Sequence, residues 1–550
     1  MFLTKTRTLV LVLFVFSTTS AQKLKKADKL IIENLKKHIE YLADDRLEGR
    51  RAGTKGEELA MDYIIGKFKE IGISAKGTEY YPQSFEINDG KQIGSSSYFT
   101  INNNSLETGK DYFPFPYSPA KKIEAAPAIA IQEADMPWFV DLAEPLEENK
   151  NNPHFDLEEY IRTNSIKAAN RGASVVILYN LSSLEDKLAF NPKDKSEKLP
   201  VPVIYVSKDA AKKYFQDKTA TLNIKIRTDI GEKNRIGHNV IGYIDNKAAT
   251  TVILGAHFDH LGYGEDGNSM LRTGEKLIHN GADDNASGTA ALIELARILK
   301  TSKAKNNNYL FIAFSGEEMG LFGSKYFTDH PTIDLAKANY MLNMDMVGRL
   351  NDSTKVLSVG GFGTSPQWAS VINPHDKKIP FVVKIDSSGT GPSDHTSFYR
   401  KDIPVLFFFT GQHRDYHRPS DDADKINYLG ELHVINYINT IITALNKQNI
   451  KLAFLKTRET QTGNTAFRVT LGIMPDYTYD GAGIRADGVT EGRPASRAGI
   501  KTGDVIIQLG DFPVNSMDTY MQALNKFKKG DKTKVKYKRG SETIETTIEF

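Results

Sequence analysis

The residues best suited to chemistry in this chain lie at the ends of strand-like runs. The apolar residues 252–254 reach Gly255 and are followed at once by His257 and Asp259. A buried strand that stops at such residues is typical of a site at the carboxyl edge of a sheet. One such pair is usually incidental, but three further runs end in the same way. These runs are 309–314, followed by Glu317 and Glu318; 340–344, followed by Asp345; and 404–409, followed by a loop with His413, Asp415 and His417.

Two adjacent acids in the stretch GADDNASG, Asp283 and Asp284, come directly before a helical pattern. In isolation such a pair caps the N-terminus of a helix. However, the small residues that follow permit close approach of the backbone, and a carboxylate held rigidly at the edge of a sheet is suited to bridging two cations. Glu317 and Glu318 are also adjacent, and neighbouring residues on a strand point in different directions. One of these glutamates can therefore bind a metal while the other faces a substrate.

Asp345 completes the set of candidate ligands. It ends an apolar run, and a buried acid needs a partner such as a cation. The chain has no cysteine, so any metal must be bound by histidine and carboxylate groups. Two histidines and three carboxylates match a two-zinc site, in which metals roughly 3.5–4 Å apart polarise a water molecule. Such a site favours hydrolysis over redox chemistry, and cobalt or manganese also accepts these ligands.

The elements that would position these residues follow from the periodicity of the sequence. Residues 238–450 alternate strand-like and helix-like segments, and the helix after Gly281 is long and amphipathic. This alternation predicts an α/β fold with a mainly parallel-stranded mixed sheet covered by helices. Upstream, residues 28–44 and 57–71 show helical spacing, with a charged, glycine-containing loop at 45–56 between them.

With 550 residues the chain is too long for one hydrophobic core, so several domains are expected. From 112 to 232, short β-like runs alternate with polar loops, and the sequence has no metal-type cluster there. We interpret this segment as a β-rich domain inserted into a site-bearing domain of residues 22–111 and 233–450. Residues 451–464 are polar and are expected to form a linker, and residues 465–550 are expected to form a separate β-rich domain.

The N-terminus combines two basic positions, Lys5 and Arg7, with an apolar run at 9–16 and small residues that end at Ala21. This pattern predicts a signal peptide at residues 1–21, because the apolar run is too short to span a bilayer. A membrane anchor is the alternative. We expect no membrane span in the mature chain and export to the periplasm or the extracellular space. The formal charge of +3 gives no indication of nucleic-acid binding.

The motifs HFDHLG, GADDNASG, FSGEEMGLFGS, NMDMVG, GPSDHTSF and DYHRPSD occur in this order. They resemble peptidase family M28, a family of zinc metallopeptidases, over residues 235–440, and LEGRRAGTKG near the N-terminus extends the resemblance. The resemblance implies two zinc ions per chain. His257 and Asp345 would bind one ion, Glu318 and His417 would bind the other, and Asp284 would bridge them.

The resemblance also assigns roles beside the metal ligands. Glu317 would be the general base, which takes a proton from water and passes it to the leaving amine. Asp259 would orient His257 through the ring nitrogen that does not bind metal. His413 competes with His417 as a ligand, and the surrounding sequence DYHRPSD favours His417. The remaining histidines of the motifs, His260 and His395, are expected to be structural or to lie near the site without binding metal.

Both β-rich segments resemble known modules. IKAANRGASVVILYN and LPVPVIYVS, within residues 112–232, resemble a protease-associated (PA) domain. EGRPASRAGIKTGDVIIQLGDFPV, within residues 465–550, resembles a PDZ domain, which captures peptide C-termini through successive backbone N–H groups. The implied carboxylate-binding loop consists of Thr470, Leu471, Gly472 and Ile473. The alternative is that this domain only packs against the site-bearing domain.

Together these features predict an exported, zinc-dependent aminopeptidase that acts on peptide substrates. Carboxypeptidase or dipeptidase activity is one alternative, because the metal-binding core is shared. A glutaminyl cyclase-like acyltransferase, with the same fold and one zinc, is another, although the complete ligand set and the adjacent Glu317 and Glu318 favour hydrolysis. The last alternative is a scaffold protein that uses only its accessory domains, and the zinc content of the purified protein would distinguish it from the enzymes.

Overall fold

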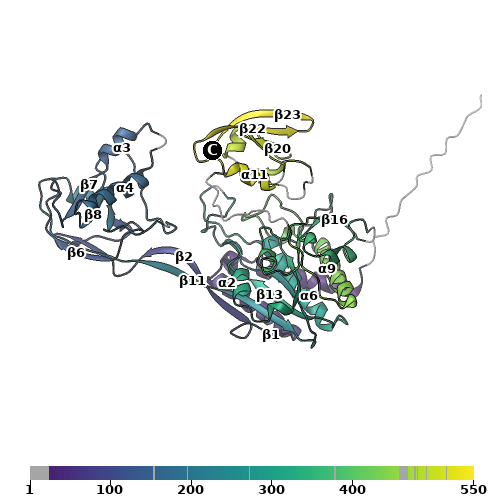
Figure 1. The fold of residues 1–550 in the computed structure, drawn as a ribbon. Helices are drawn as coiled ribbons and strands as arrows, with labels where there is room; N and C mark the ends of the chain where they lie inside the picture. The colour runs from purple at the N-terminus through teal and green to yellow at the C-terminus, as the bar shows by residue number, and fades with distance from the viewer. Residues whose placement is uncertain are drawn as a thin grey trace, which may run out of the picture.

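The computed structural model describes residues 24–550 apart from residues 153–154, 195, 272, 377–378, 458–468, 476–478, 480, 491 and 516. The predicted signal peptide at 1–21 and residues 458–464 of the predicted linker lie outside the described residues. Figure 1 shows a main unit, an inserted unit at the end of a long two-stranded ribbon, and a C-terminal unit. None of the described helices combines the length and apolar character needed to cross a membrane.

The main unit is built on a nine-stranded mixed sheet with the order β1-β11-β13-β12-β14-β17-β15-β16, in which β2 also pairs with β11. The four central strands β13, β12, β14 and β17 run parallel, and antiparallel pairings flank them. The predicted mixed α/β sheet is therefore confirmed. The strands are β1 (Ser74–Ala75), β2 (Pro82–Ile93), β11 (Ile230–Ile244), β12 (Thr251–His257), β13 (Asn308–Phe314), β14 (Ala338–Met344), β15 (Val356–Gly360), β16 (Val382–Ile385) and β17 (Val405–Phe409).

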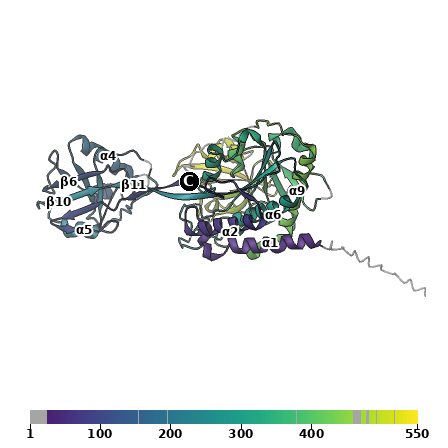
Figure 2. The same cartoon turned by 90° about the horizontal axis from the view of Figure 1, so that it is seen from below.

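Helices cover both faces of this sheet. The helices α1, α2, α6 and α9 pack on the face to which Leu254 and Leu342 contribute (Figure 2). The helices α7 and α8 pack on the other face, where Ile253 and Met341 are buried. Burial on both faces explains why the central strands are continuous apolar runs. The helices are α1 (Lys26–Leu42), η1 (Asp45–Arg50), α2 (Lys55–Ile71), η2 (Ala282–Ser287), α6 (Gly288–Thr301), α7 (Phe322–Asp329), η3 (Leu335–Lys337), η4 (Phe362–Thr364), η5 (Pro366–Ser370), α8 (His395–Tyr399), η6 (Ala423–Lys425) and α9 (Tyr428–Gln448).

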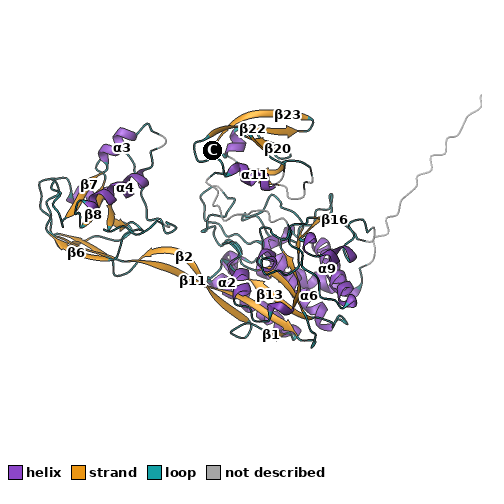
Figure 3. Cartoon of the chain, in the orientation of Figure 1, coloured by secondary structure: helices purple, strands orange, loops and turns teal. Residues whose placement is uncertain are grey.

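The strands β2 and β11 leave the main sheet as an antiparallel ribbon that carries the inserted unit (Figure 3). The inserted unit contains two four-stranded sheets, β4-β3-β10-β6 and β5-β9-β8-β7. Phe99 and Ile101 of β3 are buried in one of its cores, so the unit reaches back before the boundary at 112 that we expect from the sequence. Its elements are β3 (Tyr98–Ile101), β4 (Asn104–Ser105), β5 (Tyr112–Pro114), β6 (Lys121–Ala125), β7 (Pro137–Asp141), α3 (Ala143–Asn149), α4 (Leu157–Asn170), β8 (Val175–Tyr179), β9 (Val203–Val206), α5 (Lys208–Tyr214) and β10 (Ile224–Thr228).

The C-terminal unit is a six-stranded antiparallel sheet with the order β18-β19-β20-β22-β23, in which β21 also pairs with β20. The segment before it is only partly a linker, because Leu452 is buried in the main core and the backbone N–H of Leu455 donates to the carbonyl oxygen of Thr364 at 2.8 Å. The elements of the unit are β18 (Ile473–Pro475), β19 (Ile484–Val489), α10 (Pro494–Arg497), β20 (Val505–Leu509), β21 (Phe512–Pro513), α11 (Met517–Leu524), β22 (Lys532–Arg539) and β23 (Glu542–Glu549).

Candidate metal centre

The carboxyl ends of the four central strands meet at one edge of the sheet and carry most of the predicted site residues. His257 is the last residue of β12, and Asp345 directly follows β14. Glu317 and Glu318 follow β13, and the loop after β17 carries His417. Parallel strands place their carboxyl ends at the same edge, so these residues meet although they are far apart in the sequence.

Asp284, in η2, lies between two histidines. Its Oδ1 atom is 3.5 Å from Nε2 of His257, and its Oδ2 atom is 3.2 Å from Nε2 of His417. Each histidine also faces a second carboxylate. Oδ1 of Asp345 is 3.4 Å from Nε2 of His257, and Oε2 of Glu318 is 3.2 Å from Nε2 of His417. The five predicted metal ligands therefore form two adjacent groups that share one carboxylate.

Glu317 and Asp259 lie beside His257. Oε2 of Glu317 is 4.0 Å from Nε2 of His257, and the backbone N–H of Glu317 donates to Oδ1 of Asp259 at 3.2 Å. Nδ1 of His257 is 3.2 Å from the backbone carbonyl oxygen of Asp259 and 3.7 Å from its carboxylate. The carbonyl group is thus the nearer acceptor, and the carboxylate of Asp259, which we expect from the sequence to orient the ring, lies beside it.

His260 lies in the cluster, a position that sequence reasoning missed. Its Nδ1 atom is 2.7 Å from Oε1 of Glu318 and 3.9 Å from Oδ2 of Asp284, and the three residues form a group close enough to hold one ion. His417 reaches both carboxylates at 3.2 Å, whereas His260 is close only to Glu318. The geometry therefore favours a role for His260 in orienting Glu318. The signal was present in the motif HFDHLG, where His260 is the second histidine.

Two other histidines lie outside the two groups. Nε2 of His413 is 3.1 Å from Oδ2 of Asp283, so His413 is engaged away from His417 and the shared carboxylate. His395 is buried and stacks on Phe407, with ring centroids 4.5 Å apart. Burial lowers the pKa of His395 to about 3, which keeps its imidazole neutral at physiological pH.

Backbone groups fix both Asp284 and His417. Oδ2 of Asp421 accepts hydrogen bonds from the N–H groups of Asp283 and Asp284 at 2.9 and 3.1 Å. Nδ1 of His417 donates to the carbonyl oxygen of Asn268 at 2.9 Å. Asp421 lies in the motif DYHRPSD, but a carbonyl acceptor such as that of Asn268 is independent of residue type and cannot be recognised in a sequence.

A buried arginine joins the loops that carry the ligands. Arg50, at the end of η1, is fully buried, and its guanidinium donates to four backbone carbonyl oxygens. The acceptors are Phe258 at 2.8 Å, Asn280 at 2.6 Å, Gly281 at 3.0 Å, and Leu42. Phe258 directly follows β12, and Asn280 and Gly281 directly precede η2. Arg50 therefore connects the end of α1 to both ligand-bearing loops.

The cluster concentrates negative charge in a buried place. Burial lowers the pKa of His257 and of His417, but nearby carboxylates outweigh burial and raise both pKa values well above the usual value. Burial raises the pKa of Glu317 well above its usual range. Burial acts in the same direction on Glu318, but the nearby His417 outweighs it and holds the pKa of Glu318 well below its usual range. Oδ2 of Asp259 is buried without a hydrogen-bond partner in the described part of the chain. Buried carboxylates require positive charge, so this set of nitrogen and oxygen donors fits a divalent cation such as zinc.

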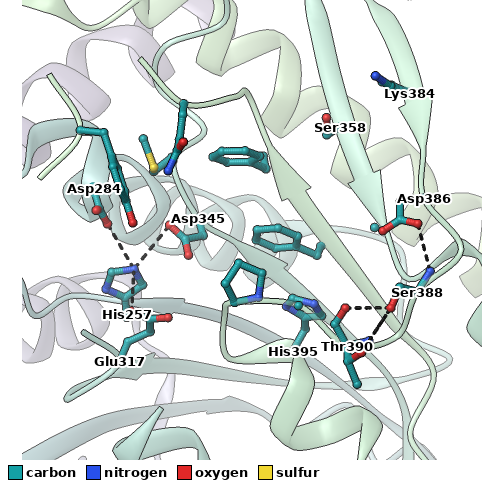
Figure 4. A pocket seen from close by; sticks show the side chains of 18 of the residues that line it. His257, Asp284, Glu317, Asp345, Ser358, Lys384, Asp386, Ser388, Thr390 and His395 are labelled. Atoms are coloured by element: carbon teal, nitrogen blue, oxygen red, sulfur yellow. Dashed lines mark hydrogen bonds and ion pairs between the residues drawn. The ribbon is translucent and has the colours of Figure 1, made fainter. Parts of the chain in front are cut away.

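A cavity of about 230 Å³ opens onto the cluster. Figure 4 shows the side chains of His257, Asp284, Glu317 and Asp345 at one end and those of Ser358, Lys384 and Asp386 at the other. The lining between and around these ends is formed by residues of β15, β16 and β17, of the start of α8 and of the adjoining loops, namely Met346, Gly360, Ile385, Ser388, Thr390, Gly391, Pro392, His395, Phe407, Phe409, Gln412 and Tyr416. The cavity provides room for a ligand that reaches from the cluster toward Lys384.

Comparison with known protein families agrees with this arrangement. Residues 239–441 match peptidase family M28, and residues 469–550 match the PDZ domain. The chain therefore contains a peptidase family M28 domain followed by a PDZ domain, as its motifs predict. All the predicted metal ligands lie within the segment that matches family M28.

Two of the curated relatives are aminopeptidases by name and match a large part of the chain. The protein is similar to aminopeptidase YwaD of Bacillus subtilis (strain 168), with 30% identity over 280 residues, which are 50% of this chain and 56% of that protein. It is similar to the probable lipoprotein aminopeptidase LpqL of Mycobacterium tuberculosis, with 23% identity over 68% of this chain and 73% of that protein. The match to YwaD thus spans little more than half the length of that relative.

Solved structures of aminopeptidases also resemble the chain. An aminopeptidase from Aneurinibacillus sp. strain AM-1 has 22% identity and a TM-score of 0.42, with 77% of this chain and 95% of that chain covered. The zinc aminopeptidase BSAP from Bacillus subtilis has 19% identity and a TM-score of 0.43, with 78% of this chain and 96% of that chain covered.

Proposed function

We propose that this protein is an exported, zinc-dependent aminopeptidase that hydrolyses N-terminal residues of peptides. The observation that carries the proposal is Asp284, whose two carboxylate oxygens face His257 and His417 at 3.5 and 3.2 Å. One carboxylate shared by two histidine-containing groups is suited to two cations that lie close together. The match to family M28 and the aminopeptidase names of YwaD and LpqL support the proposal.

Two zinc ions per chain would be held by the five clustered ligands. His257 and Asp345 would bind one ion, Glu318 and His417 would bind the other, and Asp284 would bind both. When bound, zinc supplies Lewis-acid chemistry, which polarises a carbonyl oxygen and lowers the pKa of water. The remaining polar residues of the cluster then orient the ligands and transfer protons.

Glu317 is positioned to act as the general base. Its carboxylate lines the cavity and lies 4.0 Å from Nε2 of His257, beside the ligand groups. From there it takes a proton from the attacking water and passes it to the leaving amine. Asp259 and His260 act through their neighbours: Asp259 holds His257 and the backbone of Glu317, and His260 holds Glu318.

The C-terminal unit would bind peptide C-termini at Thr470, Leu471, Gly472 and Ile473. The PDZ match supports a module of this kind, since PDZ domains capture chain ends with backbone N–H groups beside a strand. Gly472 adopts a positive φ of 79°, and Leu471 is buried. These features are consistent with a tight loop anchored by one apolar side chain just before β18.

The inserted unit would be a PA domain that narrows access to the cavity. The sequence resemblance in α4, β8 and β9 supports this assignment. Export would depend on the signal-peptide pattern at residues 1–21, and removal of that segment would leave the cluster intact because all its members lie between residues 257 and 417. The mature protein would then act on peptides in the periplasm or outside the cell.

Replacing Glu317 by glutamine tests the proposed mechanism. Loss of the general base should reduce kcat by about 10²- to 10⁴-fold while the zinc content stays unchanged. Glu275→Gln, which alters an exposed carboxylate in a nearby loop, is the matched control and should behave like the wild type. If Glu317→Gln retains activity at an unchanged zinc content, Glu317 is not the base.

Product analysis tests the direction of cleavage. The wild-type protein is incubated with a mixed peptide library, with and without a chelator, and the products are read by mass spectrometry. Stepwise loss of N-terminal residues, abolished by the chelator and restored by zinc, is the expected result. Loss of C-terminal residues would instead establish a carboxypeptidase, and loss of ammonia from N-terminal glutamine would establish a cyclase.

A further inference from the structure

The cavity continues beyond the cluster to a second polar end. Figure 4 shows Ser358, Lys384 and Asp386 at this end, well separated from the side chains of His257 and Asp345. None of these three residues belongs to the set that would bind metal or transfer protons. Because they line the same cavity as the cluster, they would contact a part of the substrate that lies away from the reacting group.

The pairing of β15 with β16 explains why a lysine lines the cavity. The two strands are parallel, and Ser358 lies opposite Lys384 in the register. The alternate residues Leu357, Val359 and Val383 are buried in the core beneath the sheet. Since successive residues of a strand point to opposite faces, Ser358 and Lys384 both point away from that core, into the cavity.

The walls between the two ends are largely apolar and aromatic. Ser358 pairs with Phe409, and Gly360 pairs with Phe407, on the strand next to β15. The rings of Phe407 and Phe409 stack with their centroids 5.9 Å apart, and both line the cavity. Gly360 brings no side chain into the space in front of Phe407. A ligand can therefore extend from the cluster past these rings, and its far end would meet the second pair of charged groups, Lys384 and Asp386.

The two charged residues at this end differ in exposure. Nζ of Lys384 is shielded from solvent, as is the hydroxyl oxygen of Ser358, which has no hydrogen-bond partner among the described residues. Asp386 is exposed, and its Oδ1 atom accepts a hydrogen bond from the backbone N–H of Ser388 at 3.3 Å. The shielded charge at this end of the cavity is therefore that of the Lys384 ammonium group, while the carboxylate of Asp386 lies in an exposed turn at the rim. A buried ammonium group is stabilised best by an anion that has lost its own water.

We infer that the end of the cavity formed by Lys384 and Ser358 receives a carboxylate group of the substrate. The ammonium group would pair with one oxygen, and the hydroxyl of Ser358 would donate to the other. This inference rests on the proposed peptidase function and specifies its substrate class. The carboxylate has two chemical sources, the side chain of an N-terminal glutamate or aspartate and the free C-terminus of a short peptide.

Matched substrate pairs that differ only in this charge test the inference. The first pair is the anilides of glutamate and glutamine, and the second is a dipeptide with a free or an amidated C-terminus. In the zinc-loaded wild type, kcat/KM should favour the charged member of one pair by about 10- to 100-fold. The pair that shows the preference identifies the source of the carboxylate.

Three variants relate that preference to the lysine. Lys384→Met should bring the ratio close to one, and Lys384→Glu should reverse it. Lys355→Met, which changes an exposed lysine outside the cavity, should leave the ratio as in the wild type. A wild-type ratio near one for both pairs overturns the inference, as does a preference that survives Lys384→Met.

Calorimetric binding separates this inference from the proposed function. Glutamate and glutamine, and the free and amidated dipeptides, are titrated into zinc-loaded Glu317→Gln protein, with and without Lys384→Met, so that hydrolysis does not interfere with the binding signal. If no substrate is hydrolysed but the charged ligand binds more tightly and loses this advantage in Lys384→Met, the inference holds and the peptidase function fails. Equal binding of charged and neutral ligands overturns the inference, whatever the protein hydrolyses.

Discussion

Replacing the buried Arg50 by methionine should destabilise the main unit far more than replacing an exposed arginine. The guanidinium is fully buried and donates to carbonyl oxygens in three separate segments, at Leu42, at Phe258, and at Asn280 and Gly281. Burial lowers its pKa to about 10, so the group is still positively charged at neutral pH. Methionine fits the stem of the side chain but offers none of the hydrogen bonds.

The magnitude follows from the four buried carbonyl oxygens that would lose their donor. A buried acceptor left unsatisfied costs about 1–3 kcal/mol, and with partial rearrangement of the four groups the total should be about 3–5 kcal/mol. The main unit contains roughly 300 residues, so its entropy of unfolding is about 0.6 kcal/mol/K. The Tm of Arg50→Met should therefore fall by about 5–8 °C. Arg50→Lys keeps the charge but has fewer donors, so it should lie between the wild type and Arg50→Met.

Differential scanning calorimetry of the zinc-loaded proteins measures this difference. Arg46→Met is the matched control, because Arg46 lies in the same turn, is largely exposed and contacts Asp44 and the ring of Tyr41 at the surface. Exposed ion pairs contribute little to stability, so its Tm should stay close to that of the wild type. If Arg50→Met unfolds at the same temperature as Arg46→Met, the four carbonyl contacts do not hold the loops together.

Two further predictions concern partners of histidines. Asp259→Asn should weaken zinc binding by about 10- to 100-fold in competition with a chromogenic chelator, whereas an unchanged affinity would assign the orientation of His257 to the carbonyl group alone. His238 is hydrogen bonded to Glu57, with 3.3 Å between Nδ1 and Oε2, and this bond raises the pKa of His238 in the folded state. Its stabilising effect is complete below the unfolded pKa of about 6.5 and is lost as the pH rises through the folded value. The urea midpoint should therefore differ more between wild type and His238→Gln at pH 6 than at pH 8.5, and an equal difference would contradict the assignment.

Most of the site residues that the sequence predicts share one property. Each of these has a side chain suited to metal binding or proton transfer, and each lies at a position that indicates the end of a buried strand. His257, Asp345 and the adjacent glutamates follow continuous apolar runs, and such runs become buried parallel strands because helices cover both faces of the sheet. The chemistry of these side chains then restricts their role to metal binding or proton transfer. Six ordered motifs make the arrangement of these strands predictable as well.

The parts of the structure that the sequence does not predict depend on contacts with backbone groups or with segments far away in the sequence, and residue type does not reveal such contacts. Arg50 lies in a loop that is charged and rich in glycine, and nothing in its type indicates that it will be buried beneath two ligand-bearing loops. His260 and His257 are the same residue type within one motif, and only the fold shows that His257 faces Asp345 while His260 faces Glu318. The start of the inserted unit is displaced because β3 pairs with β10, more than a hundred residues later, and such long-range pairing leaves little trace in a local pattern.

The loop that follows His260 contacts His417, the main unit and the inserted unit. The relative strength of the contacts with the two units decides which unit holds the ring of His417 in place. His417 donates to the carbonyl oxygen of Asn268 in this loop. The carboxylate of Asp266, in the same loop, pairs with Arg51 at 2.7 Å. The backbone carbonyl oxygen of Asp266 accepts a hydrogen bond from Lys193 of the inserted unit at 2.9 Å. Lys193 is largely exposed, so its contact is weak and screened by salt. Arg51 and Asp266 are largely buried, and a paired guanidinium there is costly to break. The ring of His417 is therefore held by the main unit through Arg51, and movement of the inserted unit on its ribbon need not disturb the cluster.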